Sequence, residues 1–324
     1  MITRDAMASI TDLFLPLEKV EGTLSYPGPI MCYESLSDHI DKIKSAVISE
    51  HKESSRFRIS VDGNSYRVTR ASTPDGDYLA MRRLRPEIMD LENIGLPSEI
   101  LRHLRSPGLS EGGLVIVSGQ SGNGKSTTCA SIIIDQLKNY GGVCNTIEYP
   151  IEMMMTGMHG DGLCIQRNVE TPDEFTQGIS DALRSYPSKS RNVLFIGEIL
   201  DCHSAAAALK SAIDGHLVFT TMHAGGVLMA LERIVSLASP HVGNEEARHL
   251  LGSGLRMVIH QKLVETMGRT SLRANFLIDT ESAAMAIQAG KSLKQLSTEI
   301  GLQKRRLLNG QTIESQRDKK AGSQ

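Results

Sequence analysis

The octapeptide GQSGNGKS at residues 119–126 constrains the fold of this 324-residue chain more than any other segment. It matches the pattern GxxxxGK followed by Ser or Thr at every fixed position. The apolar run LVIVS at 114–118 precedes it, and a stretch of helix-forming composition at 126–138 follows it. A phosphate-binding P-loop requires this strand–loop–helix context. The segment therefore predicts an α/β domain that binds a nucleotide.

The residue types in the loop suit phosphate. Its glycines allow backbone N–H groups to close around phosphate oxygens, Lys125 reaches the β- and γ-phosphates, and the Ser126 hydroxyl is a ligand for Mg²⁺. The alternative is a glycine-rich turn with a chance lysine. ATP and Mg²⁺ are the predicted ligands, and the predicted binding residues of the loop are Gly119, Ser121, Gly122, Asn123, Gly124, Lys125, Ser126 and Thr127.

Composition disfavours several other classes of protein. The formal net charge is −2, aromatic residues make up 4% and Trp is absent, so direct nucleic-acid binding is not expected. The five cysteines form no CxxC pair, which argues against a zinc site and is typical of a reduced, cytoplasmic protein. No apolar run approaches the roughly 18 residues of a membrane span. Any role at a membrane would therefore depend on a partner.

Residues 1–95 have the pattern of a small α+β domain. A helix is predicted at 35–48, where apolar residues recur at helical spacing. Alternating runs at 56–61 and 65–71 flank Asp-Gly, which predicts a hairpin, and a third strand is predicted after a second Asp-Gly. A linker is expected at 96–110.

The segment 111–265 is predicted to form the P-loop core. Helices alternate with most of its strands, which indicates a mainly parallel sheet. A helix at 171–185 opens with a capping box, and the amphipathic spacing at 244–263 predicts another helix. The predicted strands lie at 114–118, 143–148, 193–197 and 216–221.

Beyond the core, residues 266–302 are expected to form a mainly helical extension. The polar segment 303–324 is expected to be a flexible tail.

Carboxylates and histidines follow the predicted strands, where a parallel sheet places its ligand groups. Glu148 and Glu152 in TIEYPIE are placed to order Mg²⁺ or its water, with an ordinary solvated loop as the alternative. A histidine after a strand beside phosphates can stabilise the γ-phosphate, which favours a functional role for His223. For His216, at the start of the same strand, a partly buried structural histidine is the favoured alternative. NVLFIGE ends in Glu198, and the residue before it is Gly197, where many P-loop NTPases have Asp.

The order of these motifs resembles the ATPase superfamily of type II and type IV secretion systems and pilus retraction. The P-loop, TIExPIE, an apolar strand ending in Gly-Glu, and GHLVFxTxH follow one another within about a hundred residues. In that family the second acidic motif ends in Gly-Glu, so Gly197 is expected. The resemblance spans about residues 50–300 and implies a RecA-like core preceded by a PAS-like domain.

The resemblance also implies roles for single residues. Glu198 would be the catalytic base that activates water, Glu148 and Glu152 would form the acidic Asp box, and His216 and His223 the His box. Arginines on strands of the N-terminal domain reach the nucleotide in this family. Arg58 in RFRIS and Arg82 in MRRL are the candidates ahead of Arg56 and Arg83, with exposed arginines of no special role as the alternative.

Several positions depart from the family pattern. Tyr149 stands where the family usually has Asp, Leu200 replaces the usual Arg after Gly-Glu, and RSYPSKSRN at 184–192 replaces an acidic approach to the catalytic strand. These departures favour a divergent, conjugation-type member over a standard retraction motor.

The predicted function is ATP hydrolysis by a cytoplasmic motor for a type IV pilus or a type II or type IV secretion machine. By resemblance, the motor is a homo-hexamer that binds ATP between its two domains and acts on an inner-membrane platform protein. The alternatives are a RecA-like nucleic-acid motor and a non-catalytic nucleotide-binding regulator.

Overall fold

A computed structural model describes residues 10–18, 22–26, 30–31, 33–50, 55–84, 87–188, 190–267, 269–290 and 293–315. The chain divides into two compact units. One unit comprises residues 1–87 together with Pro150–Met154, and the other comprises residues 88–149 and 155–324.

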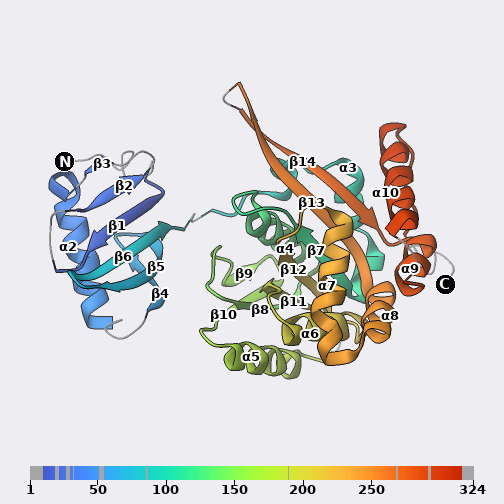
Figure 1. The fold of residues 1–324 in the computed structure, drawn as a ribbon, viewed down its shortest axis with the longest axis horizontal. Helices are drawn as coiled ribbons and strands as arrows, with labels where there is room; N and C mark the ends of the chain where they lie inside the picture. The colour runs from blue at the N-terminus through green and yellow to red at the C-terminus, as the bar shows by residue number, and fades with distance from the viewer. Residues whose placement is uncertain are drawn as a thin grey trace. The chain divides into compact units, whose positions relative to one another are not determined.

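The first unit is an antiparallel sheet with one long helix (Figure 1). Its strands have the order β3-β2-β1-β6-β5-β4, and α2 spans Tyr33–Glu50. The helix buries Leu36, Ile40, Ile43 and Val47 against alternate residues of the strands. The strands are β1 (Asp12–Pro16), β2 (Leu24–Tyr26), β3 (Ile30–Met31), β4 (Arg56–Val61), β5 (Asn64–Thr73) and β6 (Gly76–Arg83).

The predicted hairpin joins β4 and β5. Asp62 and Gly63 both have positive φ, 50° and 76°, as a two-residue turn of the primed type requires. The third predicted strand is β6. The strands β1 to β3 carry no strong sequence pattern and were not expected.

The second unit contains an eight-stranded, mainly parallel sheet, as predicted. Its order is β14-β13-β7-β12-β11-β8-β10-β9, with β9 and β14 antiparallel to their neighbours. The four predicted strands are β7 (Gly113–Ser118), β8 (Gly142–Glu148), β11 (Asn192–Glu198) and β12 (Leu217–Met222). The others are β9 (Gly157–His159), β10 (Gly162–Asn168), β13 (Leu255–Thr266) and β14 (Arg269–Ile278).

Helices cover this sheet. Leu114, Ile116, Ile196 and Val258 of the strands share one buried cluster with residues of α5 to α9. Half of the predicted capping box is present at α5, where the Thr171 hydroxyl accepts a hydrogen bond from Glu174 N–H. The Glu174 carboxylate accepts from the N–H of Glu170, one residue before the cap. The α-helices of the unit are α3 (Ser98–Leu104), α4 (Lys125–Tyr140), α5 (Pro172–Ser185), α6 (Cys202–Ile213), α7 (Val227–Val242), α8 (Asn244–Gly254), α9 (Glu281–Gln288) and α10 (Leu293–Leu308).

The helix predicted at 244–263 is wrong in its second half. Helix α8 ends at Gly254, and the chain continues as β13, which pairs in parallel with β7. The apolar run LRMVI at 255–259 is buried in the sheet on both faces. A buried run of this kind has no period that separates strand from helix, so tertiary pairing decides its structure.

Three predicted boundaries also differ from the structure. The linker predicted at 96–110 contains α3 and most of the 3₁₀ turn Pro107–Glu111, and its Ile100 and Leu104 are buried. The extension predicted at 266–302 begins with β14. The tail predicted from 303 is helical to Leu308 and described to residue 315, with residues 316–324 outside the described part.

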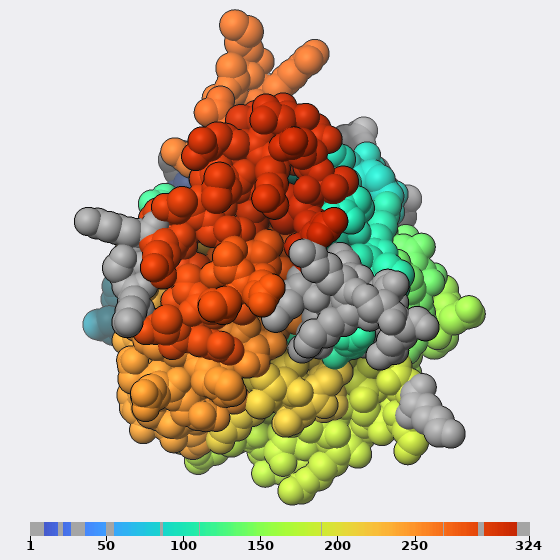
Figure 2. All heavy atoms as spheres, turned by 90° about the vertical axis from the view of Figure 1, so that its right-hand side faces the viewer, coloured from blue at the N-terminus to red at the C-terminus, as the bar shows by residue number. Residues whose placement is uncertain are grey.

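The hairpin of β13 and β14 projects beyond the body of the second unit (Figures 1 and 2). Met267 near its tip is 99% exposed. Within the described residues, no helix is long and apolar enough to cross a membrane.

Candidate nucleotide site

The P-loop connects β7 to α4 and has the backbone that phosphate binding needs. Gly119, Gly122 and Gly124 have φ of 154°, 77° and 77°, in the region that favours glycine. Gly124 also precedes the first residue of the 16-residue helix α4 and provides no side-chain cap. The first N–H groups of α4 and the positive end of its dipole therefore face the loop, an arrangement that suits an anion.

Lys125 is held inside the loop. Its side chain is 8% exposed, and Nζ donates to the Gln120 carbonyl at 3.1 Å. Ser126 and Thr127 follow in the first turn of α4 and are half-buried.

The sheet brings the predicted motifs together at one edge. Strands β7, β12, β11 and β8 are consecutive neighbours and run parallel. The P-loop follows β7, His223 follows β12, and Glu198 and Glu148 end β11 and β8. Because parallel strands end at the same side of a sheet, four segments that are distant in sequence meet there.

Glu198 and His223 form a pair at this edge. His223 Nε2 lies 3.4 Å from Glu198 Oε1, and their side chains are 43% and 31% exposed. A carboxylate that is partly exposed and held by an imidazole can accept a proton from water.

The presence of glycine at position 197 is explained by its close contact with Glu148 on the neighbouring strand β8. A Cβ at this position would lie 3.2 Å from Glu148 Cγ, tighter than nine in ten real Cβ contacts. The register between β11 and β12 also shifts at this residue, so that Glu198 pairs with Thr221. Glycine at this position therefore lets strands β11 and β8 approach each other closely.

Glu148 is buried and firmly held. It is 3% exposed, and its Oε1 accepts hydrogen bonds from Thr146 Oγ1 at 2.7 Å and Gln166 Nε2 at 2.9 Å. Burial raises the pKa of the nearby Cys129 thiol, Glu148 raises it further, and Lys125 lowers it. Both charged groups therefore lie close enough to the buried thiol to act on it.

Gln166 was missed in the sequence. Its Oε1 accepts from the N–H groups of Met155 and Thr156 at 2.6 and 2.9 Å, so that it joins Glu148 to the loop after β8. It lies on β10, which carries no motif, and only the pairing of β10 with β8 reveals it.

His216 lies away from this cluster. It precedes β12, and its carbonyl accepts from Gly113 N–H at the start of β7, whereas the P-loop follows the end of β7. Its ring packs against Tyr186 with 5.3 Å between centroids, and burial lowers its pKa. The prediction that it binds the nucleotide does not fit this position, because the length of a strand separates the two ends of the sheet.

Glu152 and the predicted arginines belong to the first unit. Glu152 accepts from Arg67 Nη1 at 2.9 Å. Arg58, Arg67 and Arg82 are direct cross-strand partners on β4, β5 and β6, and Arg82 Nε donates to Asp12 at 2.8 Å. Like charges directly opposite one another destabilise a sheet, and the ion pairs of Arg67 with Glu152 and of Arg82 with Asp12 offset part of this repulsion.

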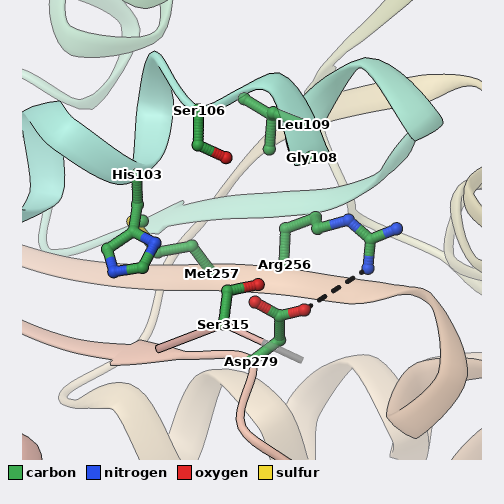
Figure 3. A pocket seen from close by; sticks show the side chains of 8 residues that line it. All are labelled: His103, Ser106, Gly108, Leu109, Arg256, Met257, Asp279 and Ser315. Atoms are coloured by element: carbon green, nitrogen blue, oxygen red, sulfur yellow. Dashed lines mark ion pairs between the residues drawn. The ribbon is translucent and has the colours of Figure 1, made fainter. Parts of the chain in front are cut away.

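A small cavity lies at the end of the eight-stranded sheet opposite the P-loop, where β13 begins (Figure 3). Arg256 and Asp279 form a buried ion pair in its wall, with 3.6 Å between Nη1 and Oδ2. The Arg256 side chain packs against Gly113, at the start of β7 and thus away from the P-loop. The lining residues are His103, Ser106, Gly108, Leu109, Arg256, Met257, Asp279 and Ser315.

Comparison with known proteins identifies the class. Residues 29–313 match the family model described as "Type II/IV secretion system protein". The chain therefore belongs to this family of secretion and pilus ATPases.

Individual proteins of known sequence or structure also resemble this chain. "Uncharacterized protein YggR" of Escherichia coli is 31% identical over 80% of this chain and 77% of its own. "Type IV pilus ATPase PilU" of Pseudomonas aeruginosa is 34% identical over 76% of this chain and 64% of its own. The solved structure "Crystal Structure of the Pilus Retraction Motor PilT and Bound ADP" superposes with a TM-score of 0.76 at 26% identity, covering 97% of this chain and 94% of that one.

Proposed function

We propose that this chain hydrolyses ATP and acts as the motor of a pilus or secretion machine. The observation that carries the proposal is the convergence of the P-loop, the Glu198–His223 pair and the buried Glu148 at the carboxyl ends of four adjacent parallel strands. The named ATPases among its relatives support the same function.

The loop would bind the triphosphate through its own backbone and Lys125. The amino group that now contacts the Gln120 carbonyl would exchange that contact for phosphate oxygens. The oxygen donors also fit Mg²⁺, a hard cation that prefers oxygen, because the Ser126 hydroxyl and the Glu148 carboxylate belong to segments that meet here. When bound, Mg²⁺ neutralises charge that develops on the phosphates.

Glu198 is the proposed base. It would accept a proton from the attacking water, with His223 orienting the carboxylate at 3.4 Å. Glu148, fixed by Thr146 and Gln166, would orient water near the phosphates.

We further propose that the chain works as a homo-hexamer beside a membrane and passes its motion to a platform protein of that membrane. The choice among pilus extension, pilus retraction and secretion depends on this partner. Sedimentation of the purified protein with and without ATP tests the assembly.

The first test is steady-state phosphate release with Mg-ATP. Lys125→Ala should lose nucleotide binding and turnover together. Glu198→Gln should retain ATP binding and lose turnover on the order of 100-fold to 10,000-fold, as expected for removal of a general base. Glu232→Gln, the same change at an exposed position of α7, is the control and should match wild type.

Other outcomes point to other functions. ATP binding by a sedimenting hexamer that releases no phosphate would favour a nucleotide-binding regulator. Turnover that depends on DNA and falls steeply with salt would favour a nucleic-acid motor.

A further inference from the structure

The apex of the P-loop is held by strand β13, which is distant in sequence. Gln261 Nε2 donates to the Asn123 carbonyl at 2.7 Å, and Leu263 N–H donates to Asn123 Oδ1 at 3.0 Å. Asn123 is thus fixed through both its backbone and its side chain. Neither Gln261 nor Leu263 belongs to a sequence motif. The segment that contains them was predicted to be helical, so these contacts could not be expected.

Close packing accompanies these hydrogen bonds. A Cβ on Gly119 would lie 2.5 Å from the Gln261 carbonyl oxygen, and a Cβ on Gly124 would lie 3.5 Å from Gln261 Nε2. Gly119 is therefore required for the approach of β13 as well as for its own backbone angle. The strand therefore contacts the loop near both of its ends.

Gln261 is an unusual residue for its position. It is 0% exposed, and its Oε1 is buried with no hydrogen-bond partner among the described residues. An unpaired buried acceptor destabilises a fold, and an apolar side chain of similar size would fill the space without that cost. The amide is therefore explained by the hydrogen bond that its N–H group donates to the loop.

We propose that Gln261 is a positioning residue that holds the P-loop in the shape that receives phosphate. The proposal rests on the function proposed above. A loop whose N–H groups already point toward the ligand loses less conformational freedom on binding, so its affinity is higher. Because Gln261 lies on β13, the same hydrogen bond joins the nucleotide site to the projecting hairpin (Figure 1).

The test compares two substitutions with a neighbouring control. Gln261→Met keeps the length of the side chain and removes the donor, and Asn123→Ala removes the acceptor for Leu263 N–H without touching the core. Lys262→Met, at the next and exposed residue of β13, is the matched control. The first readout is amide hydrogen exchange over residues 119–125 without nucleotide. The second readout is the dissociation constant for ADP.

We expect faster exchange in the P-loop of both test variants, with unchanged exchange in the other core strands. ADP should bind about fivefold to tenfold more weakly, the effect of losing one buried hydrogen bond. Lys262→Met should match wild type in both readouts.

Wild-type exchange and wild-type ADP affinity in Gln261→Met and Asn123→Ala would overturn the proposal. Faster exchange throughout the second unit would also overturn it, because it would indicate a general packing role. If exchange rises only in the P-loop while wild type and Lys125→Ala bind ADP equally poorly, the positioning role stands and the proposed function fails.

Discussion

At the scale of single residues, the candidate site depends on contacts that the motifs do not contain. The P-loop and Glu198 could be located from the sequence because their chemistry fixes residue type and spacing. Gln166 and Gln261 could not, because each acts through a strand pairing that brings residues far apart in sequence together. Sequence proximity also misled the prediction for His216. It shares a motif with His223 but lies at the opposite end of β12, away from the P-loop.

Gly197→Ala tests the close approach of the two acidic strands. The added Cβ would press on Glu148 Cγ, so we expect turnover to fall about tenfold and the free energy of unfolding to fall by about 1 kcal/mol, as for mild overpacking. Phosphate release and urea unfolding measure the two effects.

The control is Gly301→Ala in α10, where an added Cβ meets nothing within 4 Å. It should leave turnover unchanged. Full turnover in Gly197→Ala would show that the spacing of the strands does not matter to the site.

At the scale of elements, short apolar strands near motifs were predictable and their unmarked neighbours were not. Strands β7, β8, β11 and β12 were all expected, because each is a short, largely apolar run that carries or adjoins one of the motifs. Strand β13 was mistaken for helix because its buried face and exposed face do not alternate along LRMVI. Pairing with β7 on one side and β14 on the other settles its structure.

Asp201 is the N-cap residue of helix α6. Its Oδ1 accepts from Ser204 N–H at 2.8 Å, and Ser204 Oγ accepts from Asp201 N–H at 3.3 Å, a capping box for α6. Asp201→Ala should lower the free energy of unfolding by about 1 kcal/mol. Asp201→Asn, which can still cap, should restore most of it in urea titrations. Loss of turnover in Asp201→Ala with unchanged stability would mean that this carboxylate has a role in the site itself.

At the scale of the whole molecule, two histidines link stability to pH. Burial lowers the pKa of His216 and of His260 in the native state. The unfolded chain therefore binds protons more readily below about pH 6.5, the ordinary value for histidine. Their contribution to stability is complete above that value and is lost as the pH falls toward the lowered native pKa values.

We expect the urea midpoint of wild type to fall between pH 7.5 and pH 5.5. His216→Phe keeps an aromatic ring against Tyr186 and removes the titrating group, so its midpoint should fall less over the same range. An identical pH dependence in the two proteins would show that His216 does not contribute.

The hairpin of β13 and β14 has a consequence in terms of thermodynamic linkage. About four residues, or roughly 13 Å of extended chain, separate the P-loop contact at Leu263 from the exposed Met267. Any protein that binds the hairpin tip more tightly in one nucleotide state must strengthen the binding of that nucleotide by the same factor. Reciprocity of this kind would let a partner that binds the hairpin tip change the affinity for ADP without touching a phosphate.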